Sequence, residues 1–325
     1  MTILLLAVGI AILVLGGEFL VRGAVSVAAG LGMSPLVIGI VVVGFGTSMP
    51  ELVTSVEAAL VGSPGVAVGN VVGSNICNIL LILGLTALIK PVLTAKATLK
   101  RDGAVLAVAT ILCVITAMTG MVERATGLIF AMLLGAYVLY ACIGDRRQVA
   151  ADAAEAEIDI DIEAAQATGL GRAALMIAAG LAMMIFGAQM LVDAAVTLAE
   201  RLGVSDAIIG LTLVALGTSL PELVTSVVAA ARGHNDVGFG NIVGSNIYNI
   251  LGILGITAII KPVEVPAEIM QVDIWVMTAA TALLLGAAFT GWRVCRAEGG
   301  AMLAGYVAYI GWLSATALGS AAAAG

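Results

Sequence analysis

Long hydrophobic segments separated by short polar stretches make up most of this 325-residue chain. Each segment approaches the roughly 20 residues with which a helix crosses about 30 Å of hydrocarbon. They lack the alternation of apolar and polar residues over about 10 positions that is typical of transmembrane barrel strands, so we expect helices. Ten spans are predicted, near residues 3–22, 36–61, 69–89, 103–121, 125–143, 172–198, 207–231, 238–260, 271–290 and 300–320.

The composition is that of an integral membrane protein. Hydrophobic residues make up 61% and charged residues 11% of the chain, whereas charged residues reach about 25% in soluble domains. The net charge of -7 comes largely from residues 145–163 and indicates no nucleic-acid partner. The cysteines stand singly in apolar surroundings, which is typical of buried free thiols: Cys77, Cys113, Cys142 and Cys295.

The distribution of basic residues predicts the orientation, because cytoplasmic loops carry the excess of Lys and Arg. The first segment lacks a basic stretch before its apolar core, so we expect a retained helix rather than a cleaved secretory signal. With both termini outside, only Arg124, Arg201 and Lys261 fall on the outer side. The other eleven fall on the cytoplasmic side: Arg22, Lys90, Lys96, Lys100, Arg101, Arg146, Arg147, Arg172, Arg232, Arg293 and Arg296. We expect a multi-pass protein of a prokaryotic cytoplasmic (inner) membrane.

The chain contains an internal repeat with an offset of 171 residues. Residues 39–92 and 210–263 align without a gap and are identical at 35 of 54 positions, and Asp102 still matches Asp273 outside this core. An internal repeat of this length constrains the folds that the chain can adopt. Each copy contains five predicted spans, an odd number, so the two copies must enter the membrane from opposite sides. Inverted repeats of this kind are typical of secondary transporters, whose binding sites lie near the midplane.

The predicted fold class is therefore an all-α membrane protein of ten transmembrane helices, arranged as two inverted-topology five-helix repeats with discontinuous helices at the midplane. We assign residues 1–144 to the first repeat and 171–325 to the second. The acidic segment 145–170 between them is a cytoplasmic linker, in part helical. It is too short for a folded regulatory domain.

A proline and a glutamate interrupt the second hydrophobic segment in GFGTSMPELVTSV, residues 44–56, and the copy ALGTSLPELVTSV spans residues 215–227. Inside a helix a proline cannot donate a backbone hydrogen bond and displaces the carbonyl four residues earlier. Irregular backbone at membrane depth is tolerated only where it is buried in protein or lines a cavity. We expect Pro50 and Pro221 to mark broken helices with free carbonyls, at Gly46 in the first copy.

Glu51 and Glu222 lie near the middle of these two segments, where an ionisable group costs on the order of 2.5–3.5 kcal/mol. None of the fourteen Lys and Arg residues lies in the middle of a predicted span. Each glutamate must be protonated, hydrogen-bonded or neutralised by a cation. Helical spacing would place two hydroxyls on the face of each carboxylate, namely Thr47 and Ser48 beside Glu51, and Thr218 and Ser219 beside Glu222.

A second motif follows in the next span: GNVVGSNICNI at residues 69–79 and GNIVGSNIYNI at 240–250. Its serine and its last asparagine are four residues apart and offer oxygen ligands, although a small serine also suits close helix packing. The candidate pairs are Ser74 with Asn78 and Ser245 with Asn249. The remaining amides are expected to hydrogen-bond backbone: Asn70, Asn75, Asn241 and Asn246.

The available side chains favour a hard cation. Carboxylate, hydroxyl, carbonyl and amide oxygens suit Ca²⁺ and Na⁺, whereas imidazole and thiolate favour zinc or copper. His234, the only histidine, falls in a loop, and Cys77 is replaced by Tyr248 in the second repeat. One Ca²⁺ neutralises two glutamates, and Na⁺ ions could occupy the same oxygens in its place. Competition for one site is the simplest basis of exchange.

These duplicated motifs closely resemble the two alpha-repeats of the cation/calcium exchanger superfamily, specifically its prokaryotic sodium/calcium exchangers, and the resemblance covers the whole chain. It implies that Glu51 and Glu222 are the central Ca²⁺ ligands and also serve Na⁺. The further ligands that it implies are Thr47, Ser48, Thr218, Ser219, Ser74 and Ser245, the carbonyls of Gly44 and Ala215, and the side chains of Asn78 and Asn249.

One position departs from the pattern of that superfamily. Many of its members have Asp where this chain has Asn249, so this site contains two carboxylates instead of three. The ion stoichiometry and the carriage of a proton or K⁺ stay open for this reason. The resemblance also implies alternating access, in which the helices near 3–22 and 172–198 slide across the other eight.

Three other functions are weighed against Na⁺/Ca²⁺ antiport. Within the same class, H⁺/Ca²⁺ exchange is the runner-up because either glutamate could carry protons, and K⁺-dependent Na⁺/Ca²⁺ exchange is a further alternative. A channel with a carboxylate selectivity element is less favoured, since inverted repeats and broken helices indicate a carrier. A membrane enzyme is the weakest hypothesis because no Ser–His or Cys–His constellation is available. The expected partners are Ca²⁺, Na⁺ and the lipid bilayer, with no cofactor and no obligate protein partner.

Overall fold

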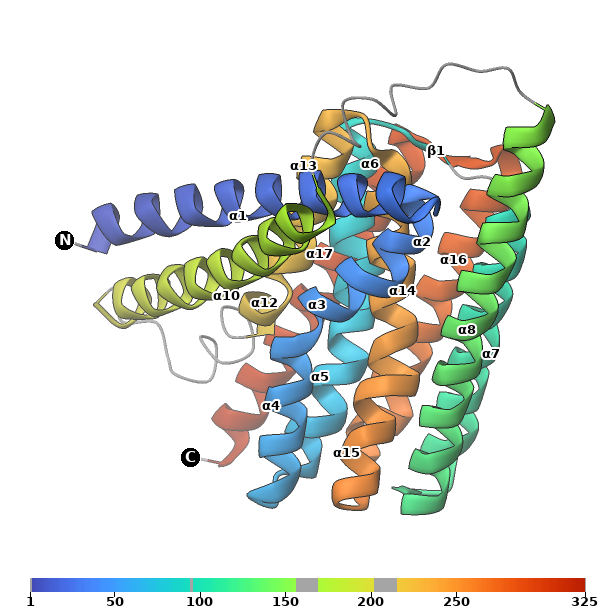
Figure 1. Ribbon diagram of the computed structural model, residues 1–325. Coiled ribbons are helices and arrows are strands. Elements are labelled where there is room, and N and C mark those ends of the chain that lie inside the picture. Colours follow the sequence, from blue (N-terminus) through green and yellow to red (C-terminus); the bar gives the residue numbers. More distant parts are fainter. Residues whose placement is uncertain (1, 94–95, 156–168, 202–214, 325) are drawn as a thin grey trace.

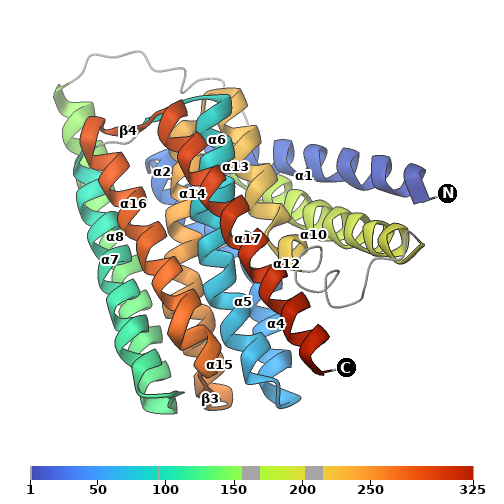
Figure 2. The same ribbon diagram turned by 180° about the vertical axis from the view of Figure 1, so that it is seen from behind.

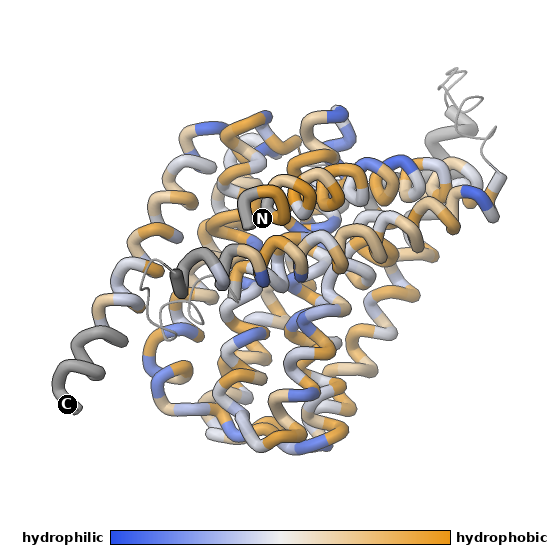
Figure 3. Tube along the Cα trace, turned by 90° about the vertical axis from the view of Figure 1, so that its left-hand side faces the viewer, coloured by the Kyte–Doolittle hydropathy of each residue, from blue (hydrophilic) through white to orange (hydrophobic). Residues whose placement is uncertain are grey.

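The computed structural model describes residues 2–93, 96–155, 169–201 and 215–324, which are almost entirely helical (Figures 1 and 2). Within them, seven helices are long and apolar enough to cross a membrane, and a bent pair of helices between Gly39 and Leu60 makes an eighth. The predicted span at 207–231 begins outside the described residues. Hydrophilic positions gather at the two ends of the bundle, with a few in its middle (Figure 3).

The first half begins with a 30-residue helix and contains two π-helical segments, η1 and η2. Its elements are α1 (Thr2–Leu31), α2 (Pro35–Ile38), η1 (Gly39–Gly44), α3 (Phe45–Thr47), α4 (Met49–Leu60), α5 (Pro64–Ile76), η2 (Cys77–Leu83), α6 (Gly84–Ile89), β1 (Val92–Leu93), α7 (Lys96–Met118), β2 (Met121–Val122) and α8 (Arg124–Glu155).

The second half follows the same order of elements over its described residues. They are α10 (Leu170–Arg201), α12 (Ala215–Thr218), α13 (Leu220–Arg232), α14 (Asn235–Ile247), η4 (Tyr248–Leu254), α15 (Gly255–Ile260), β3 (Val263–Glu264), η5 (Ile269–Asp273), α16 (Ile274–Gly291), β4 (Arg293–Val294) and α17 (Arg296–Ala324).

Both predicted helix breaks are present, and each falls two residues before its proline. The first is at Ser48 (φ −83°, ψ 5°) and the second at Ser219 (φ −89°, ψ 4°). The segments on either side of Ser48 are bent by 47°. Pro50 and Pro221 therefore lie in the first turn of a new helix, where the missing N–H has no intrahelical partner to lose. The expectation that proline itself interrupts a running helix is wrong in this detail.

The π-helical segments η2 and η4 occupy matching positions in the two halves and carry Asn78 and Asn249 in their first turn. An extra residue per turn locally disturbs the regular hydrogen bonding of a helix, and such bulges are frequent at functional sites. Both segments are almost wholly buried. The repeated sequence therefore places two amides inside the bundle at the same level of each half.

Two short antiparallel ribbons join the halves, and each pairs a strand from one half with a strand from the other. β1 pairs with β4, with Val92 opposite Val294, and β2 pairs with β3, with Val122 opposite Val263. Helices also pack across the two halves: α6 of the first half packs on α17 of the second, and α15 of the second half packs on α8 of the first. The two halves are thus interlocked rather than set side by side.

Helices α1 and α10 lie side by side and cross the rest of the bundle obliquely (Figures 1 and 2). Small residues bring their backbones together: a Cβ at Gly16 would lie 2.9 Å from the carbonyl oxygen of Gly180. Close approach of this kind is typical of membrane helix pairs. The pair forms a separate layer beside the helices that carry the two repeated motifs.

The helix ends differ from the predicted boundaries in two places. The helix expected near 3–22 continues as α1 to Leu31, and the one expected near 125–143 continues as α8 to Glu155, into the predicted linker. The extension of α1 is apolar and belongs to one continuous span from Ala7 to Leu31, whereas the extension of α8 contains charged residues, at which a hydrophobic segment is expected to end. The linker residues 156–168 lie outside the described part of the chain.

Candidate functional site

Glu51 and Glu222 lie in the first turns of α4 and α13 and are each only 1% exposed. The helix breaks at Ser48 and Ser219 position them there, because each new helix starts in the interior of the bundle. The first turn of a helix carries a partial positive charge that favours an anion. Both carboxylates are therefore held by backbone geometry inside an otherwise apolar bundle.

Each carboxylate is bonded by a hydroxyl from the opposite half of the chain. Ser48 Oγ donates to Glu222 Oε1 at 3.2 Å, and Ser219 Oγ donates to Glu51 Oε1 at 3.3 Å. The predicted arrangement, with each hydroxyl beside the carboxylate of its own repeat, is wrong in this respect. The break at the serine turns its side chain away from the following helix and toward the other copy.

Several buried oxygens at this centre have no hydrogen-bond partner among the described residues. They include Oε2 of both Glu51 and Glu222 and Oδ1 of both Asn78 and Asn249. No ion pair in the described part of the chain involves either glutamate. Buried polar atoms are normally satisfied, so a symmetric group of unsatisfied oxygens calls for a specific explanation. Carboxylate and amide oxygens together form a ligand set for a hard cation.

Two asparagines hold the first turns that carry the glutamates. Asn70 Nδ2 donates to the Glu51 carbonyl at 2.9 Å and to Ser55 Oγ at 2.8 Å. Its counterpart Asn241 donates to the Glu222 carbonyl at 3.3 Å and to Ser226 Oγ, which lies in α13 with Glu222, at 3.1 Å. The predicted backbone-binding role of these two residues is confirmed. They position the helix starts and leave the carboxylates free for other contacts.

The other two asparagines of the motif behave differently from one another. Asn246 Nδ2 donates to the Ile242 carbonyl at 2.7 Å, as predicted. Asn75 instead accepts a hydrogen bond from Asn249 Nδ2 at 3.1 Å, which links the halves through their asparagines. This contact orients Asn249 and leaves its Oδ1 pointing at no protein donor. The sequence motif contains no signal for it, because the two residues are 174 positions apart.

The hydroxyls of the Glu222 flank are fully enclosed. Thr47 Oγ1 donates to Asn241 Oδ1 at 3.1 Å, and Ser245 Oγ lies 3.4 Å from the carbonyl oxygen of Gly44. That carbonyl also accepts the Ser48 N–H at 3.2 Å. Thr47 and Ser245 are both 0% exposed. Ala215, the counterpart of Gly44, begins α12, and only its backbone position is described.

The Glu51 flank is open instead. A cavity of about 350 Å³ reaches it, and its lining includes Asn70, Ser74, Thr218 and Asp273. A Cβ at Gly73 would meet no described atom within 4 Å, whereas one at the matching Gly244 would lie 2.9 Å from the Ile40 backbone. The same motif is thus solvent-accessible in one half and packed against η1 in the other.

Among the predicted candidates, Ser48 and Ser219 contact the two carboxylates directly, and Ser74 and Thr218 line the cavity. Asn78 and Asn249 are buried, each with one oxygen that has no hydrogen-bond partner among the described residues. Cys77 lines the cavity but has no second thiol near it, and His234 caps α14 away from the site. No group of three or more His, Cys, Asp or Glu side chains occurs within the described residues. Two carboxylates and a set of neutral oxygens therefore define the chemistry of this centre.

A broken-helix bundle with two buried carboxylates is the architecture of an ion carrier, and the comparisons with known proteins agree. Residues 1–143 and 172–315 match the sodium/calcium exchanger protein family, and the chain belongs to that family. Its relatives are transporters and not enzymes. The chain is accordingly a multi-pass membrane antiporter of the prokaryotic cation/calcium exchanger type.

Relatives match over nearly the full chain. CaxA of Alkalimonas amylolytica is 39% identical over 93% of this chain and 95% of its own. The sodium/calcium exchanger MaX1 of Methanosarcina acetivorans is 33% identical over 94% and 97%, respectively. The inner membrane protein YrbG of Escherichia coli is 34% identical over 95% and 97%. The solved sodium-calcium exchanger NCX_Mj superposes with a TM-score of 0.82 at 29% identity, covering 95% of this chain and 98% of that one.

Proposed function

We propose that this protein exchanges Na⁺ for Ca²⁺ across the membrane, and that the two ions compete for one site between Glu51 and Glu222. The observation that carries the proposal is the cross-bonding of the two carboxylates, each held by a serine of the other half. A site assembled from both repeats changes whenever the halves move against each other. Binding and conformational change are then coupled, as antiport requires.

Electrostatics favours a cation between the glutamates. Two carboxylates that are 1% exposed and have no basic partner among the described residues carry a desolvation cost of several kcal/mol each if charged. One Ca²⁺ cancels both charges, and Na⁺ ions do the same in greater number. The Oδ1 atoms of Asn78 and Asn249 are buried without a hydrogen-bond partner among the described residues, and amide oxygens suit either ion.

The proposed ligands fall into two groups. Glu51 and Glu222 bind Ca²⁺ directly and also serve Na⁺. Neutral oxygens complete the coordination and the flanking Na⁺ positions, and those we assign are Thr47, Ser48, Thr218, Ser219, Ser74, Ser245, Asn78, Asn249 and the carbonyls of Gly44 and Ala215.

We further propose ten spans in two inverted five-helix repeats, residues 1–144 and 171–325, joined by a cytoplasmic linker at 145–170, with both termini outside. Alternating access would come from sliding of α1 and α10 across the other helices. The glycine contacts between Gly16 and Gly180 support a rigid pair, because backbones that approach this closely move together.

Reconstituted vesicles test the exchange directly. Ca²⁺ uptake is measured under an imposed Na⁺ gradient, under a pH gradient alone, and with K⁺ present or absent. We expect uptake with the Na⁺ gradient only, and no dependence on K⁺. Uptake driven by the pH gradient alone would favour H⁺/Ca²⁺ exchange, and uptake that needs no counter-ion would indicate a channel.

A further inference from the structure

Asp102 and Asp273 occupy matching positions in the two repeats and bind a tyrosine in the same way. Tyr137 of α8 donates to Asp102 Oδ1 at 3.1 Å, and Tyr309 of α17 donates to Asp273 Oδ1 at 2.8 Å. The first contact ties α7 to α8 and the second ties η5 to α17, so each joins the fourth span of its half to the last helix of that half. The two aspartates share this structural role.

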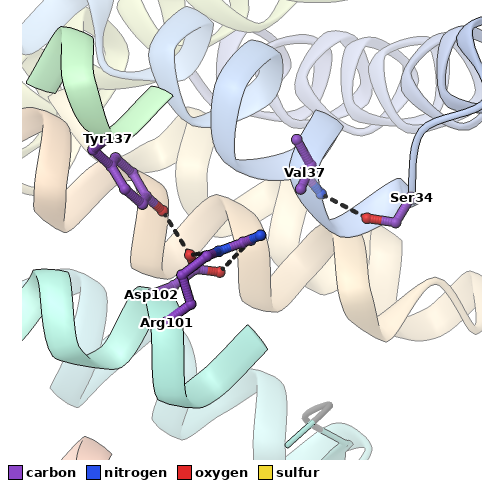
Figure 4. A network of polar contacts seen from close by, with 5 residues as sticks. All are labelled: Ser34, Val37, Arg101, Asp102 and Tyr137. Carbon is purple, nitrogen blue, oxygen red and sulfur yellow. Dashed lines mark hydrogen bonds and ion pairs between the residues drawn. The ribbon is translucent and has the colours of Figure 1, made fainter. Parts of the chain in front are cut away.

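The two aspartates differ in their ion pairing. Arg101 donates to both oxygens of Asp102, at 2.6 and 3.0 Å, and Figure 4 shows Arg101 and Tyr137 converging on this carboxylate, which is 1% exposed. The residue that matches Arg101 in the second half is Val272. Asp273 has no ion pair within the described residues and is only half-buried. Asp102 is paired with its neighbour Arg101, whereas Asp273 has no basic partner among the described residues.

Asp273 faces the cavity that reaches the Glu51 flank. The same cavity is lined by Ser74 and Thr218, which belong to the proposed ion site, and by Asn70. Both amide protons of Asn70 are committed to Glu51 and Ser55. Asn70 therefore presents its carbonyl oxygen to other groups. The cavity beside the Glu51 flank is thus lined by a carboxylate that has no ion pair among the described residues and by neutral oxygens.

We infer that Asp273 forms an outer cation site, a docking position at which a hydrated Na⁺ or Ca²⁺ pauses before it reaches the central pair. A single carboxylate in a polar cavity retains a hydrated ion weakly, because a tight Ca²⁺ site needs six to eight oxygen ligands. Its field raises the local concentration of cations and so the rate of capture. The charge neutralised by Arg101 gives the Asp102 side no such site.

The first experiment compares Ca²⁺ transport kinetics of Asp273→Asn with the wild type, and it rests on the proposed exchange. We expect the KM for Ca²⁺ to rise roughly three- to tenfold at low ionic strength, with little change in kcat. High salt should remove the difference, because screening suppresses the effect of the charge. Glu268→Gln, an exposed residue five positions earlier, is the matched control and should leave KM unchanged.

An unchanged KM in Asp273→Asn, or an equal rise in Glu268→Gln, would overturn the inference. So would a fall in kcat alone, since that result belongs to a residue that only ties η5 to α17. Tyr309→Phe separates the two roles further. It removes the hydrogen bond of 2.8 Å and keeps the charge, so KM should stay near the wild-type value.

A second experiment does not depend on transport. In the full chain with Glu51→Gln and Glu222→Gln, Tb³⁺ is added as a probe for a Ca²⁺-type ion, and emission sensitised by the nearby tyrosines is recorded. We expect weak, saturable emission that Asp273→Asn removes and that Ca²⁺ displaces. Emission that persists in Asp273→Asn would contradict the site even if Na⁺/Ca²⁺ exchange holds. Failure of exchange in the wild type would instead contradict the proposed function alone.

Discussion

The Glu51 and Glu222 flanks are built from the same motifs and differ in packing. Asn70 is half-buried beside a cavity, whereas its counterpart Asn241 is 0% exposed and bonded to Thr47. The carboxylates themselves are equally buried, at 1% exposure each. The two repeats therefore bury their glutamates equally but differ in how accessible the surrounding residues are to solvent. Because the residues are the same, the difference reflects the arrangement of the helices and not the chemistry of the motif.

Such a difference is what a carrier with two alternating states would show in one of them. The centre stays shared, and only the flank in contact with solvent changes. The two aspartates add an asymmetry of sequence, since Arg101 pairs with Asp102 whereas the matching Val272 cannot neutralise Asp273. Movement of the helices would exchange the solvent access of the two flanks. It would not change the residues beside the two aspartates, which differ in sequence.

The largest effect is expected at the shared centre. Glu51→Gln and Glu222→Gln should each abolish Ca²⁺ transport in vesicles, to the same extent, although only the Glu51 flank is open. Folding should be retained, because no basic group in the described residues loses a partner and the glutamine oxygen can still accept the hydrogen bond of the serine from the other half. Near wild-type transport in either variant would contradict the site assignment. The elution profile in detergent serves as the control for folding.

The next effect concerns stability at the two aspartates. Asp102→Asn leaves the partly buried Arg101 without its carboxylate and should lower the free energy of unfolding by about 2–3 kcal/mol. Asp273→Asn should cost less than about 1 kcal/mol, since only the Tyr309 hydrogen bond is altered. Denaturation midpoints in mixed detergent micelles measure both variants. Equal losses would show that the charge pair contributes little beyond the tyrosine contact.

A smaller effect is expected at the matched glycines. Gly244→Ala would place a Cβ 2.9 Å from the Ile40 backbone, and the required shift of η1 should cost about 1–2 kcal/mol. Gly73→Ala meets no described atom within 4 Å and should leave stability almost unchanged. Thermal unfolding in detergent compares the two. If the flanks exchange roles during transport, Gly73→Ala should nevertheless slow exchange.

Solvent access at single matched residues gives the most local comparison of the two flanks. Thr54 lines the cavity, and its counterpart Thr225 is 0% exposed. In a cysteine-free background, Thr54→Cys should react with a charged thiol reagent about tenfold faster or more than Thr225→Cys, because only solvated thiols form the reactive thiolate readily. Mass spectrometry of the labelled protein gives the rates. Equal rates would mean that both flanks are open.

Much of this organisation could be predicted from the sequence. The hydrophobic segments, the two broken helices and the buried position of both glutamates follow from local composition and from the cost of a charge in hydrocarbon. The backbone-binding roles of Asn70 and Asn241 were also accessible, since amides near a helix break find free carbonyls. The segments, the breaks and the glutamate positions depend on neighbours along the chain, whereas the two asparagine contacts each span 19 positions within one repeat.

Contacts between the halves could not be derived in this way. Ser48 bonds Glu222 rather than Glu51 because the break at Ser48 turns its side chain toward the other copy, and Asn75 bonds Asn249 because α5 packs against η4. The repeat offset predicted that the motifs meet but not which atoms pair. The cavity beside Gly73 depends on the packing of whole helices, to which the identical motif gives no clue.

Whether Ca²⁺ and Na⁺ share one site is tested most directly by equilibrium binding. Ca²⁺ binding to the purified wild-type protein is measured by titration calorimetry at increasing Na⁺ concentration. If Glu51 and Glu222 form one site that the two ions share, the tighter Ca²⁺ binding step weakens steadily as Na⁺ rises and is absent from the Glu51→Gln variant. Tight Ca²⁺ binding that is unaffected by Na⁺, or that survives in the variant, would contradict a shared site between the two halves.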